Sequence, residues 1–169
     1  MKLILVLHNI RSIYNVGAIL RTAEGLGVAE VVFSGYTPRY DDQKLLPHLR
    51  AKLDRQIEKS ALGAEKMIKQ ESVDALPTWL NNKRADGFTV VGLENNLKPE
   101  EAGRKVLLND TKQLPDSALV LILGEEVNGI PEEIRKECQY FLEIPMKGRK
   151  ESFNVSVAAG IAMWGLLNR

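Results

Sequence analysis

Residues 118–131 read ALVLILGEEVNGIP, and this stretch indicates the class of fold. Its first part, Ala118–Leu123, is an unbroken apolar run of the length of one β-strand, and a glycine loop follows it. Strands that are apolar on both faces belong to parallel sheets that helices cover on both sides. The next segment, Pro131–Cys138, is predicted to be a helix because proline and two glutamates stand near its start and basic residues near its end. The stretch thus predicts one strand–loop–helix unit of an α/β fold.

The same alternation extends from this stretch in both directions along the chain. Apolar runs typical of buried strands alternate with segments of helical periodicity, and we find neither a repeat nor a linker between them. The predicted strands are Leu3–Leu7, Glu30–Ser34, Phe88–Leu93, Ala118–Leu123 and Tyr140–Ile144, and the predicted helices are Gly17–Gly27, Leu76–Ala85, Pro131–Cys138 and Asn154–Asn168. Residues 35–60 read as an irregular, charged segment. We therefore predict a single α/β domain over residues 1–169, with a mostly parallel sheet and helices on both of its faces.

The composition restricts the classes of function. With 23 basic and 22 acidic residues the formal net charge is +1, so any surface for nucleic acid must be local. One cysteine and two histidines supply neither a disulfide framework nor a metal cluster, and Cys138 is predicted to be a buried, inert thiol. The apolar run at the N-terminus is too short for a signal peptide or a membrane span. We expect a cytoplasmic protein that uses no metal and no membrane.

Two of the predicted helices differ in how polar and apolar side chains are arranged around them. In Gly17–Gly27 the apolar side chains share one face, and Arg21 points away from that face toward solvent, a ligand or another chain. In Asn154–Asn168 almost no polar face is left. A helix that is apolar all round needs burial all round, which either the core of this chain or a partner subunit can supply.

Three loops at the ends of predicted strands carry polar residues. The first leads into the first helix and contains Asn15, a predicted helix cap. The second is the glycine loop with Glu125 and Glu126, and the third is the basic loop Met146–Lys150 before the last helix. In open α/β sheets, ligands bind at the carboxyl ends of the strands, which is where these loops are expected.

The glycine loop excludes two common sites for nucleotides. Gly129 is followed by Ile130 and Pro131, where a phosphate-binding P-loop needs lysine and serine or threonine, and no predicted strand is followed by Gly-x-Gly-x-x-Gly. Glu125 and Glu126 would repel a pyrophosphate, whereas a cationic cofactor such as a sulfonium meets no such penalty. These features argue against an oxidoreductase that binds a nucleotide cofactor on an ordinary doubly wound sheet.

Together, in this order along the chain, the three loops closely resemble the signature motifs of the SpoU (TrmH-type) branch of the SPOUT superfamily, the RNA ribose 2′-O-methyltransferases. The most diagnostic is IPMKGRKESFNVSVAAGIA at residues 144–162, in which Phe153 takes the place of a leucine. Residues 60–65, SALGAE, also look like an element of the family. The resemblance covers essentially the whole chain. It does not include the separate N-terminal RNA-binding domain of many relatives, so we expect one domain here.

The resemblance implies a C-terminal deep trefoil knot, a homodimer, and S-adenosyl-L-methionine as the methyl donor, with S-adenosyl-L-homocysteine as the product. It implies methylation of a ribose 2′-hydroxyl in a structured RNA, with tRNA favoured over rRNA and with no metal. By motif position the cofactor pocket is expected to contain Leu123, Gly124, Gly129, Ile144, Met146, Ser152, Phe153 and Asn154. The alternative is a protein of the same fold that binds RNA without transferring a methyl group.

The same resemblance implies a group of catalytic residues, which are Arg21, Asn15, Glu126, Ser152 and Asn154. Arg21 is the residue we expect to act on the substrate, and Glu126 and Ser152 are expected to order the site and the arginine. A guanidinium keeps its proton until above about pH 12, which makes it a poor general base. We therefore expect Arg21 to hold a substrate phosphate and to stabilise the forming alkoxide.

Local basic groups are the candidates for holding RNA phosphates. They are Arg11, Arg39, Lys147, Arg149 and Lys150. Residues 36–59 also mix aromatic and basic side chains, which can stack on unpaired bases and follow phosphates, but acidic residues are interspersed among them. Both this segment and the basic loop are equally open to a second interpretation as ordinary solvated surface.

Overall fold

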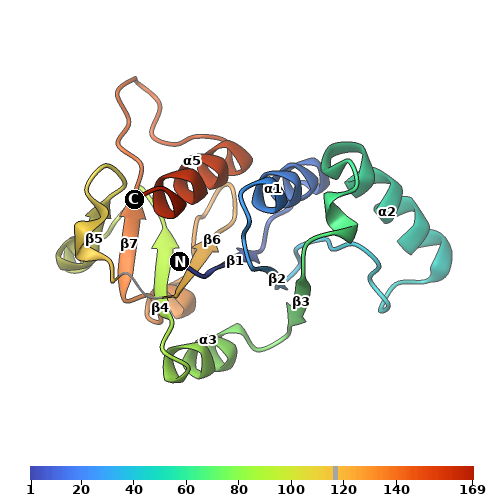
Figure 1. Ribbon diagram of the computed structural model, residues 1–169, viewed down its shortest axis with the longest axis horizontal. Helices are drawn as coiled ribbons and strands as arrows, with labels where there is room; N and C mark the ends of the chain where they lie inside the picture. The colour runs from blue at the N-terminus through green and yellow to red at the C-terminus, as the bar shows by residue number, and fades with distance from the viewer. Residues whose placement is uncertain (116–117) are drawn as a thin grey trace.

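The computed structural model describes residues 1–115 and 118–169, and its centre is a seven-stranded sheet (Figure 1). The strands are β1 Leu3–His8, β2 Glu30–Ser34, β3 Gln70–Val73, β4 Thr89–Leu93, β5 Lys105–Leu107, β6 Leu119–Leu123 and β7 Tyr140–Glu143. Their order across the sheet is β3-β2-β1-β6-β4-β7-β5, and every pair of neighbours is parallel. The predicted parallel α/β sheet is confirmed.

Helices cover both faces of this sheet. They are α1 Ile13–Gly25, α2 Pro47–Ala61, α3 Leu76–Ala85, α4 Glu132–Arg135 and α5 Val155–Leu167, with short 3-10 helices η1 Ala64–Lys66, η2 Pro99–Arg104 and η3 Thr111–Gln113. In Figure 1, α1 and α5 lie side by side on one face and α3 lies on the opposite face. None of the helices in the described part of the chain is long and apolar enough to span a bilayer.

The alternation of side chains along the central strands explains why their sequences are apolar throughout. Leu3, Leu5 and Leu7 of β1 pack into the cluster under α1 and α5, whereas Ile4 and Val6 pack into the cluster over α3 and α4. Successive side chains of a strand point to opposite faces, so a strand covered on both sides needs an apolar residue at every position. The sheet therefore sits in the middle of two hydrophobic layers.

The order of the strands differs from their order in the chain, because β6 lies between β1 and β4, and β7 lies between β4 and β5. The last two strands of the chain, β6 and β7, thus lie inside a sheet whose other strands come earlier in the sequence. The trefoil knot implied by the resemblance concerns how the connecting loops pass one another, and it stays a prediction.

The prediction of an irregular segment over residues 35–60 is wrong, because α2 occupies its second half. Only one narrow side of α2 meets the core, through Leu53, Ile57 and Ala61 at intervals of four residues. The rest of the helix is more solvated and rich in charged residues, so few apolar residues mark its buried side. Proline at the first helical position was the signal that could have revealed it.

Helix boundaries correct two further predictions. α1 begins at Ile13 rather than Gly17, and its cap is Ser12, whose side chain accepts a hydrogen bond from the backbone N–H of Asn15 at 3.3 Å. The expectation that Asn15 caps this helix is therefore wrong. Because Ser12 is the cap, the side chain of Asn15 is free to make other contacts. The predicted helix Pro131–Cys138 contains only four α-helical residues, with Pro131 as the cap.

The two strands that the sequence analysis missed, β3 and β5, lie at the two edges of the sheet. β3 reads QESV and β5 reads KVL. Edge strands are short and partly polar because one of their sides faces solvent. Their sequences consequently lack the apolar run by which the central strands were recognised.

Candidate functional site

Four neighbouring strands bring their carboxyl ends to the same edge of the sheet. In the order β1-β6-β4-β7, Leu7 pairs with Leu123, Leu123 with Leu93, and Leu93 with Leu142. The loops that follow these strands therefore start beside one another, although they are far apart in the sequence. This is the edge at which ligands bind in parallel α/β sheets.

A pocket opens among these loops. Its lining consists of Leu93, Glu94, Asn95, Asn96, Leu123, Gly124, Glu125, Glu126, Val127, Gly129, Ile144, Ser152, Phe153, Asn154, Val155 and Ala158. Seven of the eight residues expected to bind a cofactor are among them, and Met146 is the exception. The second and third motif loops thus meet in one cavity, together with the loop after β4 that no motif had indicated, whereas the first motif loop contributes no residue to the described lining.

The glycine loop owes its tight shape to its two glycines. Glu125 and Gly129 exchange backbone hydrogen bonds of 3.0 and 2.9 Å, which close the loop. A side chain at Gly124 would overlap the backbone of Gly129 and Ile130, so only glycine fits there. Gly129 has a φ of +67°, a conformation that glycine adopts without strain. These glycines fold the loop itself rather than making room for a phosphate.

Glu126 fastens the first motif loop to the glycine loop. Its carboxylate accepts hydrogen bonds from the backbone N–H groups of Arg11 at 3.2 Å and Ser12 at 3.3 Å, and from the side-chain amide of Asn15 at 3.3 Å. Burial would raise the pKa of Glu126, but backbone hydrogen bonds, chiefly its own, and the Asn15 bond outweigh that effect and lower the pKa. Glu126 is therefore a structural anion in this site.

Asn15 and Asn154 extend this connection to the last helix. The side-chain amide of Asn154 donates to the side-chain oxygen of Asn15 at 3.3 Å. The side-chain oxygen of Asn154 caps α5 by accepting from the backbone N–H of Ser156 at 2.9 Å. Glu126, Asn15 and Asn154 thus form one hydrogen-bonded chain across all three motif loops. The structure brings together three of the five residues expected to be catalytic.

The other two expected catalytic residues stand apart from this chain. Ser152 lines the pocket, but its exposed hydroxyl makes no hydrogen bond with any described residue. Arg21 lies outside the pocket lining, on the exposed surface of α1, and it forms no ion pair or hydrogen bond with the described residues. The apolar face of α1 is buried at Ile19 and Ala23, so the predicted outward direction of Arg21 is confirmed.

The five cations expected to bind RNA divide into two groups. Lys147, Arg149 and Lys150 lie in an exposed loop and have no ion-pair partner among the described residues. Arg11 pairs with Glu125 at 2.5 Å, and Arg39 is half-buried and pairs with Asp42 at 2.7 Å. The basic loop is therefore available to an anionic partner, whereas Arg39 already has its counter-ion.

The basic side chains of α2 form a ridge that was hidden in the charged sequence. We call His48, Lys52, Arg55 and Lys59 the α2 ridge; they follow one another at intervals of four, three and four residues and are all exposed. None of them has an ion-pair or hydrogen-bond partner in the described part of the chain. The neighbouring acids are engaged elsewhere, since Asp54 accepts from the backbone of Asp41 at 2.8 Å and Glu58 pairs with Lys66 at 3.0 Å. Neither of these acids forms an ion pair with a residue of the ridge.

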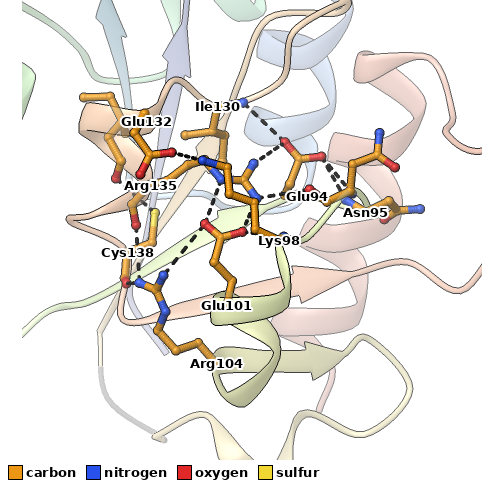
Figure 2. Close-up of polar contacts among 11 residues, drawn as sticks. Glu94, Asn95, Lys98, Glu101, Arg104, Ile130, Glu132, Arg135 and Cys138 are labelled. Carbon is orange, nitrogen blue, oxygen red and sulfur yellow. Dashed lines mark hydrogen bonds and ion pairs between the residues drawn. The ribbon is translucent and has the colours of Figure 1, made fainter.

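The loop after β4, which lines the pocket with Leu93, Glu94, Asn95 and Asn96, was not predicted from the sequence. Glu94 and Asn95 directly follow β4 and join the loops on either side of them through several hydrogen bonds (Figure 2). Neither residue belongs to one of the three family motifs from which the site was predicted. Their position at the carboxyl end of a buried strand was the signal that could have found them.

The pocket combines apolar walls with an unusual charge balance. Leu123, Ile144 and Phe153 contribute apolar surface, Glu94, Glu125 and Glu126 contribute carboxylates, and no basic residue belongs to the described lining. Such a site favours a ligand with an apolar part and a positive charge, and it disfavours a polyphosphate. Among the described residues no group of three or more His, Cys, Asp or Glu is placed to hold a metal ion.

Related sequences support the same interpretation of the motifs. Residues 2–164 match the SpoU rRNA Methylase family. The chain is 32% identical over 162 residues to the 23S rRNA (guanosine-2′-O-)-methyltransferase RlmB of Pseudomonas putida, a match that covers 96% of this chain and 57% of that protein. With RlmB of Pseudomonas aeruginosa it shares 30% identity over 167 residues, which cover 99% of this chain and 59% of that protein. The chain spans a little under three fifths of the length of these curated relatives.

Solved structures share the arrangement of strands and helices. An AdoMet-bound rRNA methyltransferase from Sinorhizobium meliloti superposes with a TM-score of 0.77 at 23% identity, over 98% of this chain and 55% of that one. The TrmH/SpoU tRNA modifying enzyme of A. aeolicus gives a TM-score of 0.76 at 24% identity, over 99% of this chain and 74% of that one. At these identities the likeness shows the fold. Because the family match extends over almost the entire chain, the protein belongs to the SpoU rRNA Methylase family.

Proposed function

We propose that this protein transfers a methyl group from S-adenosyl-L-methionine to a ribose 2′-hydroxyl of a structured RNA. One observation carries the proposal. The second and third motif loops, which are distant in the sequence, line a single pocket, and hydrogen bonds of Asn15 with Glu126 and Asn154 attach the first motif loop to them. The family to which the chain belongs and the 2′-O-methyltransferase named among its relatives agree with this assignment.

The residues of the pocket fit the proposed cofactor. Bound there, S-adenosyl-L-methionine would supply a methyl group made electrophilic by a sulfonium charge. Leu123, Ile144 and Phe153 would hold its apolar surface, and the carboxylates of Glu125 and Glu126 would face a cation without the repulsion that a phosphate would meet. Backbone groups of the glycine loop would add directional contacts. Met146, which is outside the lining, has no role in this assignment.

The chemistry requires alignment more than acid–base power. The 2′-oxygen forms a bond to the methyl carbon as the bond from that carbon to sulfur breaks, and the hydroxyl proton leaves to a substrate phosphate or to water. Holding the two reactants in line is the main task of the protein. Arg21 would hold the substrate phosphate by its two-pronged guanidinium and stabilise the charge that forms on the oxygen.

A homodimer would reconcile this role with the position of Arg21 outside the pocket of its own chain. Val157 and Trp164 lie on one face of α5 and are 49% and 60% exposed, respectively. The same helix begins at the pocket. Apolar side chains exposed to this degree on one helix face favour a protein contact. We therefore propose that a second copy covers α5 and brings its Arg21 toward the pocket.

Two exposed groups of cations would hold the RNA. The α2 ridge runs from His48 to Lys59, a rise of about 16 Å along the helix, which allows contact with more than one phosphate. The basic loop of Lys147, Arg149 and Lys150 leads directly into the pocket residues Ser152 and Phe153. We propose that the ridge anchors the RNA and that the basic loop guides the target nucleotide.

The deciding experiment measures transfer of labelled methyl groups from S-adenosyl-L-methionine to bulk tRNA and to rRNA in parallel. We expect label that resists alkali between its two flanking nucleotides, which identifies a 2′-O-methylated ribose. Wild-type protein that binds S-adenosyl-L-homocysteine but labels neither RNA would contradict the proposed transfer and favour an RNA-binding protein without it. Mixing Arg21→Ala protein with a pocket variant, each inactive alone, should restore activity if a second copy supplies the arginine.

A further inference from the structure

The carboxylate of Glu94 is completely occupied by the protein. One oxygen accepts hydrogen bonds from the backbone N–H groups of Asn95 and Asn96, both at 3.1 Å. The other accepts from the backbone N–H of Ile130 at 3.3 Å and from the guanidinium of Arg135 at 3.2 Å. The Glu94 side chain is only 11% exposed. A carboxylate with four donors and little exposure has no free lone pair to offer a ligand.

These bonds attach Glu94 to the glycine loop. Ile130 follows Gly129, the residue of positive φ at which the loop turns. A side chain at Gly129 would overlap the carboxylate oxygen of Glu94 that accepts from Ile130. The tight conformation of the loop and the position of Glu94 therefore depend on each other.

The neighbouring residue Asn95 attaches the same segment to the third motif loop. Its side-chain oxygen accepts from the backbone N–H of Ile144 at 3.1 Å, and its amide donates to the carbonyls of Ile144 at 3.0 Å and Glu151 at 3.3 Å. Glu94 and Asn95 together connect their own loop after β4 to the glycine loop and to the third motif loop. A shift at this point would change the shape of the pocket on two sides.

A buried ion pair supports Glu94 from behind (Figure 2). Arg135 is 6% exposed and Glu101 is 3% exposed, and the guanidinium binds both oxygens of Glu101, with one contact at 2.8 Å. Arg135 also donates to the carbonyl of Asn96 at 3.1 Å. The hydrogen bond from Arg135 lowers the pKa of Glu101 to about 2, so both partners are charged at neutral pH. Replacing a buried ion pair by apolar residues is often neutral or stabilising, so stability alone gives little reason for this cluster.

We propose that Glu94 is a positioning residue that sets the shape of the cofactor pocket, and that Arg135, held by Glu101, keeps Glu94 in place. This inference rests on the proposed function for the identity of the ligand, but not for the connections among the loops. Glu94 acts through the glycine loop and through Asn95 and touches no reacting atom.

The variant Glu94→Gln tests this role without creating a cavity. A glutamine amide is the same size, yet its NH2 group must face either the two backbone donors of Asn95 and Asn96 or the donors of Ile130 and Arg135. We expect the Kd for S-adenosyl-L-homocysteine, measured by calorimetry, to rise at least tenfold. RNA affinity should stay within twofold of wild type, and adding Arg135→Met to Glu94→Gln should have little further effect.

Glu137→Gln is the matched control, because it breaks the 2.5 Å ion pair with Arg84 in a part of the chain that lines neither the pocket nor its loops. A merely structural role predicts that both variants lower the melting temperature and leave the Kd unchanged. A Kd for Glu94→Gln within twofold of wild type would overturn the inference.

Amide hydrogen exchange separates this inference from the proposed function. In Glu94→Gln, but not in Glu137→Gln, we expect faster exchange in residues 94–96, 124–130 and 144–151. If wild type binds no S-adenosyl-L-homocysteine and these loops still loosen, the proposed function fails while the positioning role stands. If exchange in the loops is unchanged, the positioning role fails whatever the protein binds.

Discussion

The two sides of the pocket are built in opposite ways. Behind the glycine loop, Glu94, Arg135 and Glu101 are buried, charged and paired with one another. On the open side, Lys147, Arg149 and Lys150 of the basic loop are exposed and have no counter-ion among the described residues. Paired buried charges fix geometry, whereas unpaired exposed charges remain available to a partner. The difference indicates that the first side holds the pocket in shape and the second meets the substrate.

The largest effect is expected at Arg21, on the exposed surface of α1. Arg21→Ala should reduce the rate of methyl transfer at least 100-fold, a size typical for the loss of one group that stabilises developing charge. The Kd for S-adenosyl-L-homocysteine should stay within twofold of wild type, because Arg21 is outside the pocket. Arg21→Lys keeps the charge but loses the planar fork, so it should recover little activity. Full activity of Arg21→Lys would contradict the phosphate-holding role.

A pair of alanine substitutions compares the two sides directly. Gly124→Ala places a methyl group against the backbone of Gly129 and Ile130, whereas a side chain at Gly148 in the basic loop meets no atom within 4 Å. We expect Gly124→Ala to weaken binding of S-adenosyl-L-homocysteine at least 30-fold and to lower the melting temperature. Gly148→Ala should change neither quantity measurably. If calorimetric titration gave the same Kd for both variants, the distinction between the side behind the glycine loop and the open side would be wrong.

A smaller effect is expected from the α2 ridge. Lys52→Gln, Arg55→Gln and Lys59→Gln combined should weaken RNA binding about tenfold and reduce the salt dependence of log Kd by about 2. Cofactor binding and the melting temperature should not change. The control is Lys112→Gln combined with Lys136→Gln, two exposed lysines elsewhere on the molecule. An unchanged salt slope in the ridge variant would show that the ridge is ordinary solvated surface.

The last prediction concerns the dependence of stability on pH. The pKa of Glu101 is lowered from 4.5 to about 2 in the folded protein. A lowered pKa contributes stability above the unfolded value, and that contribution is lost as the pH falls from 4.5 toward 2. It corresponds to about 3 kcal/mol at most. The difference in unfolding free energy between wild type and Glu101→Gln should shrink over this range; a difference that is constant with pH would argue against a charged Glu101.

The sequence was sufficient for the features that repeat along the chain or that belong to a motif. The central strands β1, β2 and β6 were found because burial on both faces demands an apolar residue at every position. The motif residues Leu123, Gly124 and Asn154 proved to lie at one pocket because parallel strands end at the same edge.

The features that were missed depend on partners that no local pattern shows. Glu94 looks like an ordinary loop residue until the fold brings Ile130 and Arg135 to its carboxylate from positions 36 and 41 residues away. α2 was missed because its solvated surface masks the narrow side that meets the core. The position of Arg21 outside the pocket could not be predicted either, since a motif gives the presence of a residue and not its place in the fold.

The bond between Asn15 and Asn154 joins residues that are 139 positions apart. During synthesis, a nascent chain that has not reached Ser152 lacks Ser152, Phe153 and Asn154, and with them one whole wall of the pocket. Every earlier strand of the sheet can already be present at that stage. Affinity for the proposed cofactor would therefore appear only after these residues, so a nascent chain that already carries the whole sheet would still be unable to bind this small molecule.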